Sequence, residues 1–201
     1  MARNQQQNEK MREDRIKQIQ AEALHQFANK GLFATKIRDI AEGVGMAQGL
    51  IYHYYKSKED IYVELIKNAL DKMNAAVLML KETPLPPHEK ISMAIKQMLY
   101  TIETSEDFTQ TCRLIAQATN STAIPEDAKK LIEEKRDLPY QELAKIIAAG
   151  QKEGTITAGD PKELALVFWT SLNGLAIYKA TRREHTSMPD PGILINIFLK
   201  E

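Results

Sequence analysis

Residues 35–58 read TKIRDIAEGVGMAQGLIYHYYKSK, and this stretch determines how the rest of the chain is organised. Apolar residues at positions 37, 40, 41 and 44 recur at the spacing of one helical face, which predicts a short amphipathic helix. We expect Thr35 to cap this helix, because its hydroxyl can accept a bond from an otherwise unpaired backbone N–H. Gly45 follows where the chain must turn, and a second short helix is predicted over residues 48–55. The pattern therefore predicts a helix-turn-helix, a motif whose second helix enters the major groove of DNA.

The chain around this motif resembles the DNA-binding domain of the TetR family of bacterial transcriptional regulators over residues 12–72. The positions that carry the resemblance are Phe27, Gly31, Thr35, Ile40, Ala41, Gly45, Gly49, Tyr52, His53, Tyr54, Lys58 and Glu59. One position departs from the family, because Ala47 stands where family members usually place Ser or Thr to cap the recognition helix. Loss of that cap costs about 1 kcal/mol of helix stability. The rest of the chain resembles the family only in its helical layout.

The resemblance implies a set of DNA contacts in and around the second helix. Hydroxyl and imidazole groups, and the amino end of a helix beginning at Ser57, offer donors to phosphate oxygens. Gln48 can pair with adenine in the major groove, and Gly49 lets the backbone approach the DNA closely. The predicted DNA-contacting residues are Thr35, Lys36, Ala47, Gln48, Gly49, Tyr52, His53, Tyr54 and Lys58. For Tyr52 and Tyr54 the alternative is aromatic packing in the core.

The composition narrows the class of protein. The 201 residues are enough for one large hydrophobic core or two small ones. The 27 basic side chains balance the 27 acidic ones, so the overall charge does not indicate a nucleic-acid partner. Cys112 is the only cysteine, which excludes a disulfide within the chain and favours a reducing compartment. No apolar run approaches the roughly 20 residues that cross a membrane and no signal peptide is recognisable, so we expect a cytoplasmic protein without a membrane partner.

Helical periodicity continues through the rest of the chain, and no segment alternates as a β-strand does. We expect an all-α protein of about nine helices, the first over residues 10–30 and the fourth, a long one, over residues 57–81. The later helices are predicted over residues 88–104, 107–118, 124–154 with a break at Pro139, 160–183, and from Pro189 onward. The predicted domains are a disordered arm over residues 1–11, a DNA-binding domain over residues 12–72, and an effector-binding and dimerisation domain over residues 73–201.

The resemblance implies two further sites in this last domain. One is a pocket for a small-molecule effector, of the mostly apolar kind with a few polar groups. Its candidate lining residues are Met93, Met98, Phe108, Cys112, Tyr140, Trp169 and Asn173. The other is a homodimer interface between two copies of the last two helices, with Val167, Ser171, Gly174, Leu175, Tyr178, Leu194, Ile197 and Phe198 as candidates. For each of these residues, packing within the core of one chain is the alternative.

No constellation of side chains indicates catalysis or metal binding. The glycines at 43, 45 and 49 resemble a dinucleotide-binding loop, but such a loop must follow a β-strand and this one follows a predicted helix. The histidines lack the spacing of metal ligands. We therefore predict no cofactor or metal. The resemblance to the TetR family implies a DNA-binding regulator: a repressor that binds a palindromic operator as a homodimer and responds to an effector. A helical enzyme and a ligand-independent architectural DNA binder are the alternatives.

Overall fold

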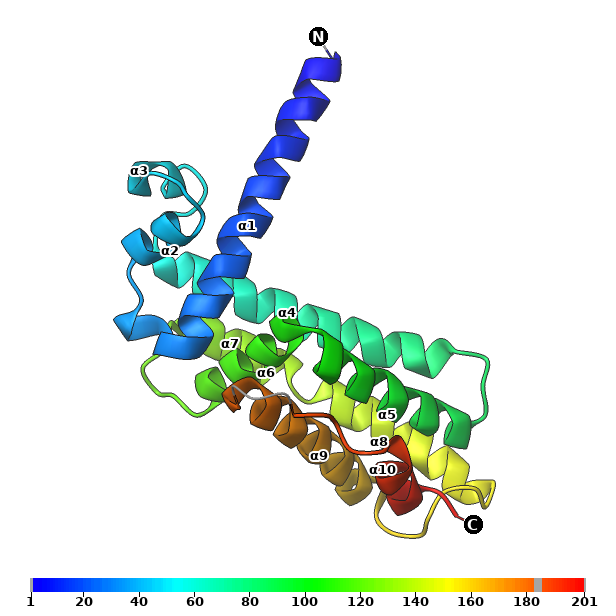
Figure 1. The fold of residues 1–201 in the computed structure, drawn as a ribbon. Coiled ribbons are helices and arrows are strands. Elements are labelled where there is room, and N and C mark those ends of the chain that lie inside the picture. The colour runs from blue at the N-terminus through cyan, green and yellow to red at the C-terminus, as the bar shows by residue number, and fades with distance from the viewer. Residues whose placement is uncertain (1, 183–185, 201) are drawn as a thin grey trace.

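The computed structural model describes residues 2–182 and 186–200. These residues form ten helical segments and one isolated β-bridge between Ile156 and Leu199, so the predicted all-α class is confirmed (Figure 1). The segments are α1 (Ala2–Ala34), α2 (Ile37–Gly43), α3 (Gln48–Ile51), α4 (Lys58–Glu82), α5 (Pro87–Thr104), α6 (Glu106–Thr119), α7 (Glu126–Lys135), α8 (Leu138–Lys152), α9 (Pro161–Thr181) and α10 (Pro191–Phe198).

Helix α1 begins at Ala2 rather than at residue 10, so residues 2–11 of the predicted disordered arm are helical, and residue 1 lies outside the described residues. Its amino-terminal half projects away from the rest of the molecule, as Figure 1 shows. The carboxy-terminal half buries one stripe, including Ile19, Ala23 and Phe27, against the first core. Because that half already nucleates the helix, each added turn carries no further nucleation cost. The helix is interrupted at Gly31, whose φ of 79° suits glycine, as predicted.

Local sequence signals fix where the later helices begin. The Ser57 hydroxyl accepts a bond from Asp60 N at 3.1 Å and starts α4. The Asp160 carboxylate accepts bonds from the first turn of α9 in the same way, at 2.7 and 3.2 Å. The predicted long helix is interrupted at residues 136–137, just before Pro139, which lies in the first turn of α8. This interruption separates α7 from α8, which is why ten segments replace about nine. Helix α9 ends at Thr181, and its predicted end at Arg183 lies outside the described residues.

Two hydrophobic cores lie at opposite ends of α4. The first packs α1, α2, α3 and the beginning of α4, with the Phe27 and Tyr62 rings edge to face at 5.4 Å. It also takes in side chains from α6 and α7, such as Leu114 and Ile132. The second core packs the end of α4 against α5, α8, α9 and α10. Helix α4 contributes to both cores, and the domain boundary near residue 72 stays a prediction.

Polar contacts hold the helix-turn-helix part to the rest of the molecule. Arg113 on α6 donates to Asn29 Oδ1 at 3.0 Å, and Gln117 donates to the carbonyl of Ala28 at 3.0 Å. On α4, Asp71 pairs with Lys135 of α7. Nearer its carboxyl end, Lys81 pairs with Glu142 of α8 at 3.1 Å. These contacts set the position of α1 and α4, and therefore of α2 and α3, relative to the second core.

Candidate nucleic-acid interface and effector domain

The predicted helix-turn-helix is present in the structure. Helix α2 buries Ile37, Ile40 and Ala41, and α3 buries Ile51, so both helices pack on the first core. Gly45, with a φ of 65°, makes the turn between them. Helix α3 ends at Ile51 rather than at residue 55, and the following residues continue as a turn. The packing leaves the opposite face of α3 open to solvent.

The start of α3 is exposed and its backbone is unobstructed. Ala47 occupies the cap position and makes no side-chain cap bond, as its methyl group predicts. Gln48 and Gly49 follow, and both are exposed. A Cβ atom placed on Gly49 would meet no other atom of the chain within 4 Å. A helical glycine costs about 0.5–1 kcal/mol relative to alanine, and the packing of this chain gives no reason for that cost.

The structure contradicts both roles predicted for Thr35. Its side chain is fully buried, and its hydroxyl donates to the carbonyl of Gly31 at 2.8 Å. The residue therefore closes the end of α1 instead of capping α2, and its hydroxyl is unavailable to a phosphate. Lys36 is the cap residue of α2, with its backbone N–H donating to the Asp39 carboxylate at 3.2 Å. Sequence spacing could not predict the bond of Thr35, because its partner is the backbone carbonyl of Gly31 in the preceding turn.

Lys58 is also engaged within the chain. Its ammonium donates to three carbonyl oxygens, those of Leu32 and Phe33 in the last turn of α1 and that of Thr35 just after it, at 2.7, 3.2 and 2.8 Å. An ammonium has three N–H donors and all three are used here. In this arrangement the ammonium has no N–H donor left for a phosphate. It ties the first residue of α4 to the end of α1, and so holds α2 and α3 between them.

The remaining predicted DNA contacts divide into exposed and packed residues. Tyr52 is 51% exposed and His53 is also exposed, beside α3. Tyr54 is half-buried against the first core, with the Arg12 guanidinium 6.0 Å from its ring centre. The predicted contacts that lie on the surface are Lys36, Ala47, Gln48, Gly49, Tyr52 and His53. The prediction omitted Leu50, which is 47% exposed on α3 although it is one of the larger apolar side chains.

Some of the predicted effector-pocket residues come together in the second core. The rings of Tyr140 and Trp169 lie 6.1 Å apart, and Met98 packs against the same core. Asn173 lies one helical turn beyond Trp169 on α9 and is half-buried. Trp169 Nε1 and the Asn74 side-chain oxygen are both buried with no hydrogen-bond partner among the described residues. The prediction did not include Asn74, which lies on α4.

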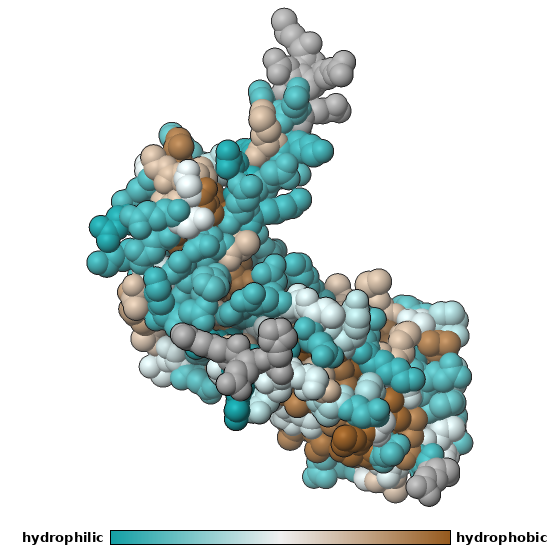
Figure 2. Space-filling model, in the orientation of Figure 1, coloured by the Kyte–Doolittle hydropathy of each residue, from teal (hydrophilic) through white to brown (hydrophobic). Residues whose placement is uncertain are grey.

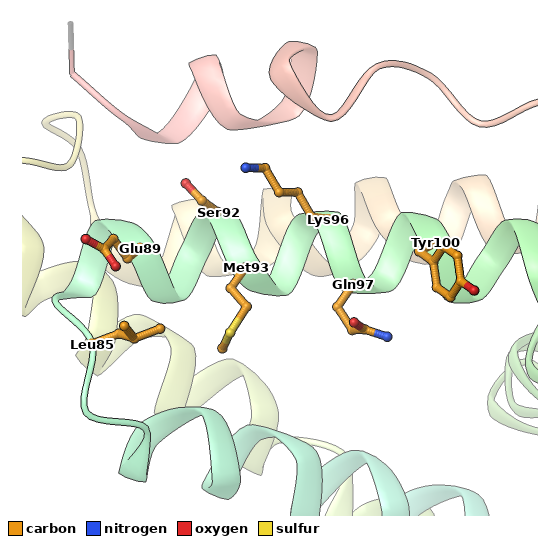
Figure 3. Close-up of a pocket in the computed structure, with 7 residues that line it drawn as sticks. All are labelled: Leu85, Glu89, Ser92, Met93, Lys96, Gln97 and Tyr100. Atoms are coloured by element: carbon orange, nitrogen blue, oxygen red, sulfur yellow. The ribbon is translucent and has the colours of Figure 1, made fainter.

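The other predicted pocket residues lie elsewhere. Phe108 and Cys112 are on α6, and burial raises the pKa of the Cys112 thiol to about 12. Met93 lies on the outer side of α5, in a groove of about 500 Å³. Figure 3 shows its lining side chains spread along α5 and the preceding loop: Leu85, Glu89, Ser92, Met93, Lys96, Gln97 and Tyr100. Met93 is therefore separated from the Tyr140–Trp169 pair.

The last two helices leave an apolar face exposed, and Figure 2 shows hydrophobic surface gathered over them. Its large side chains are Leu166, Val167, Tyr178, Ile193 and Ile197. Gly174 lies among them on α9, and a Cβ atom there would meet nothing within 4 Å. Ser171 and Leu175 are half-buried. We call this surface the α9–α10 face.

Two residues predicted for the dimer interface are packed inside this chain. Phe198 is fully buried, with its ring 5.7 Å from that of Phe168, and Leu194 belongs to the same core. Helix α10 is only eight residues long, and its inward side is needed to close the second core. The sequence pattern identified the apolar residues of α10 but not which of them point outward.

In the described ranges, no three His, Cys, Asp or Glu side chains are grouped so that they could hold a metal ion. In the same ranges, no helix combines the length and apolar character needed to cross a membrane.

Comparison with known proteins agrees with this geometry. Residues 19–65 match the family model described as bacterial regulatory proteins, tetR family. The HTH-type transcriptional repressor KstR2 of Mycolicibacterium smegmatis is 36% identical over 81 residues, which cover 40% of this chain and 38% of that protein. The HTH-type transcriptional regulator RutR of Escherichia coli K12 is 29% identical over 162 residues, covering 77% of this chain and 70% of RutR.

Solved structures share the fold over nearly the whole chain. The ketosteroid transcriptional regulator KstR2 of Mycobacterium tuberculosis superposes with a TM-score of 0.75 at 20% identity, covering 93% of this chain and 96% of that one. AibR, in complex with isovaleryl coenzyme A and operator DNA, superposes with a TM-score of 0.70 at 14% identity, covering 90% and 94%. At these identities the likeness extends to the fold of both the helix-turn-helix part and the helical part that follows.

Proposed function

We propose that this chain, a member of the TetR family of bacterial regulatory proteins, is a ligand-responsive transcriptional repressor that binds a palindromic operator as a homodimer. The observation that carries the proposal is the open amino-terminal end of α3. There Gln48 and Gly49 face solvent. The packing of the chain leaves room for a side chain at Gly49, so the glycine there exposes backbone that a partner can approach. Close approach of a partner is a physical reason for glycine at such a position, and DNA is the partner that a helix-turn-helix binds.

The α9–α10 face supports the homodimer. An exposed apolar face rimmed by polar residues is typical of a protein–protein interface. Gly174 lies in the middle of a 21-residue helix with open space above it, which allows a second helix to approach closely. Two copies related by a two-fold axis would present two α3 helices, which reach successive major grooves when they lie about 34 Å apart. A two-fold dimer therefore calls for a palindromic operator.

The second core supports the response to an effector. Trp169 Nε1 is an unpaired donor and the Asn74 oxygen an unpaired acceptor, and buried polar groups normally find partners. A ligand that reached either atom could supply the missing partner. Asn74 lies on α4, the helix that joins both cores, so a ligand bonded to Asn74 could favour one position of α4 over another. The effector must bind the released state more tightly than the DNA-bound state to cause release.

The experiment that tests the proposal measures binding of the full-length protein to its own upstream intergenic DNA and to a random duplex, at two salt concentrations. Specific binding that weakens steeply with salt is the expected result. Equal binding to both duplexes would favour an architectural DNA binder. Absence of binding to either duplex at low salt would overturn the proposal and favour the enzyme alternative.

A variant at Gly49 makes the test specific to the recognition surface. Gly49→Val should weaken operator binding at least tenfold, because its side chain occupies the space through which the DNA approaches, while leaving the unfolding temperature unchanged or higher. Ala75→Val adds similar bulk at an exposed position of α4 and should leave binding unchanged. Wild-type affinity in the Gly49 variant would contradict the role given to α3.

A further inference from the structure

Helix α3 and the turns on either side of it carry no charged Asp, Glu, Lys or Arg side chain. No Asp, Glu, Lys or Arg occurs between residues 43 and 55. The exposed residues of this surface are Ala47, Gln48, Gly49, Leu50, Tyr52 and His53. Charged side chains flank this surface: Lys36 and Lys56 are exposed on either side of it. Arg38 pairs with Glu42 at 3.5 Å on α2, and Lys58 is bonded to carbonyl oxygens. Side chains that could reach base edges from α3 are therefore neutral.

This charge pattern limits which bases the surface can read directly. Guanine is read most often by the paired donors of Arg or Lys, and cytosine by the acceptors of Asp or Glu. None of these side chains stands on the exposed face of α3. Gln48, in contrast, carries the amide that pairs with the N6 and N7 atoms of adenine.

Leu50 adds an apolar group to the same face. Its neighbour Ile51 is fully buried in the first core, whereas Leu50 is 47% exposed and faces solvent. The apolar group that bases present in the major groove is the C5-methyl of thymine. An exposed leucine on a helix that enters this groove thus has a matching partner only at A·T base pairs.

We propose that α3 reads A·T base pairs in the operator, with Gln48 pairing with adenine and Leu50 packing against a thymine methyl group. This inference rests on the proposed function and deepens it, because it names the bases that the recognition helix selects. It makes Leu50 a specificity-determining residue, although Leu50 is not one of the residues of the first core.

The test begins with selection of duplexes from a random double-stranded library by the full-length protein. Selected sequences should share half-sites whose major-groove contacts under α3 are adenine and thymine. Each thymine in the selected half-site is then replaced by deoxyuracil, which removes only the methyl group. At one position this should weaken wild-type binding about fourfold, the change expected when one buried CH2-sized group is lost.

Variants assign the effect to Leu50. In Leu50→Ala the same deoxyuracil substitution should change affinity less than twofold, because the side chain that contacts the methyl group is gone. Met79→Ala removes an exposed apolar side chain of α4 and should keep the full fourfold effect. The Tm and dimer content of each variant are measured alongside, so loss of folding is distinguished from loss of readout.

The two proposals fail in different ways. Failure to enrich any duplex would overturn the proposed function itself. Enrichment of half-sites with guanine or cytosine under α3, or equal binding to thymine and deoxyuracil at every position, would leave the regulator intact and overturn the A·T reading. A deoxyuracil effect that persists in Leu50→Ala would reject Leu50 as the reader.

Discussion

At the scale of single residues, Lys58 shows how a side chain that matches a family pattern can serve the protein itself. The family resemblance places it among phosphate contacts, whereas the structure gives all three of its donors to the turn that ends α1. That turn precedes α2 by only a few residues, so the position of α3 depends on it. We therefore expect Lys58 to affect DNA binding through the position of α2 and α3 rather than through its charge.

Replacing Lys58 by Met should separate these two roles, because Met keeps an unbranched apolar stem and removes the ammonium. The free energy of unfolding should fall by about 1–3 kcal/mol, the range for hydrogen bonds to a charged group. Operator affinity should fall, while the slope of log K against log salt should stay the same. Denaturant unfolding and binding titrations at several salt concentrations measure both.

Lys56→Met is the matched control, since Lys56 is exposed and is separated from Lys58 by one residue. Its unfolding free energy should equal that of the wild type. If Lys58→Met has a shallower salt slope and an unchanged free energy of unfolding, Lys58 contacts a DNA phosphate instead.

Cys112 provides a second prediction at this scale. Burial raises the pKa of its thiol to about 12, so only a very small fraction is thiolate at pH 8. Alkylation by iodoacetamide at pH 8 should be at least about 100-fold slower in the folded protein than in the chain unfolded by denaturant, where the thiol regains a pKa near 8.5. A difference below tenfold, measured by mass spectrometry over time, would contradict the burial of this thiol.

At the scale of elements, α4 is tied to α7 through Asp71 and to α8 through Glu142, and the two ties differ in exposure. The Glu142 side chain is 6% exposed and receives Lys145 at 2.6 Å and Lys81 at 3.1 Å. Hydrogen bonds from Lys145 and then Lys81 hold the pKa of its carboxyl below the ordinary value. Asp71 is 40% exposed, and hydrogen bonds from Lys135 and Lys67 lower its pKa too.

Glu142 should therefore contribute to acid sensitivity. A carboxyl whose pKa is lower in the folded state stabilises the fold above the unfolded pKa of about 4.5, and this contribution is lost as pH falls through the folded pKa. Glu142→Gln should lower the Tm by about 2–6 °C at pH 7, with the difference from wild type shrinking below pH 4.5. Thermal unfolding followed by circular dichroism between pH 3 and pH 7 measures this.

Asp71→Asn is the control for this experiment. Exposed ion pairs contribute little to stability, so its Tm at pH 7 should fall by less than that of Glu142→Gln. A Glu142 variant whose difference from wild type is constant across the pH range would show that the carboxylate charge is not the cause.

The elements also show what the sequence could predict. Caps at Ser57 and Asp160 were predictable because the bonded groups lie within three residues of each other. The early start of α1 was not, because a polar stretch carries no apolar stripe that marks it as helical. Thr35 and Phe198 were misassigned because their partners come from another turn and another helix, which local spacing cannot reveal.

At the scale of the whole molecule, the proposed dimer makes the strongest prediction. Gly174→Arg places a long charged side chain where a second copy would approach, and arginine is a better helix former than glycine, so the single chain should stay folded. Sedimentation should show a dimer for the wild type and a monomer for the variant. Operator affinity should fall at least about 100-fold, because the half-sites are no longer bound together.

Gln141→Arg adds the same side chain to an exposed position of α8 and should remain dimeric. A Gly174→Arg protein that sediments as a dimer would exclude the middle of the α9–α10 face from the interface. A wild-type monomer at the concentrations used for DNA binding would contradict the homodimer altogether.

The composition of the first core has a consequence for how the chain is made. Although α1 to α4 supply most of it, Leu114 of α6, Ile132 of α7 and Ile124 of the connection between them complete it. During synthesis at 5–20 residues per second, the stretch from Leu70 to Ile132, roughly 60 residues, takes about 3–12 s to emerge. For that interval the newly made helix-turn-helix lacks part of its apolar cover. We therefore expect the first core to close only after residue 132 has left the ribosome, when about two thirds of the chain has been made.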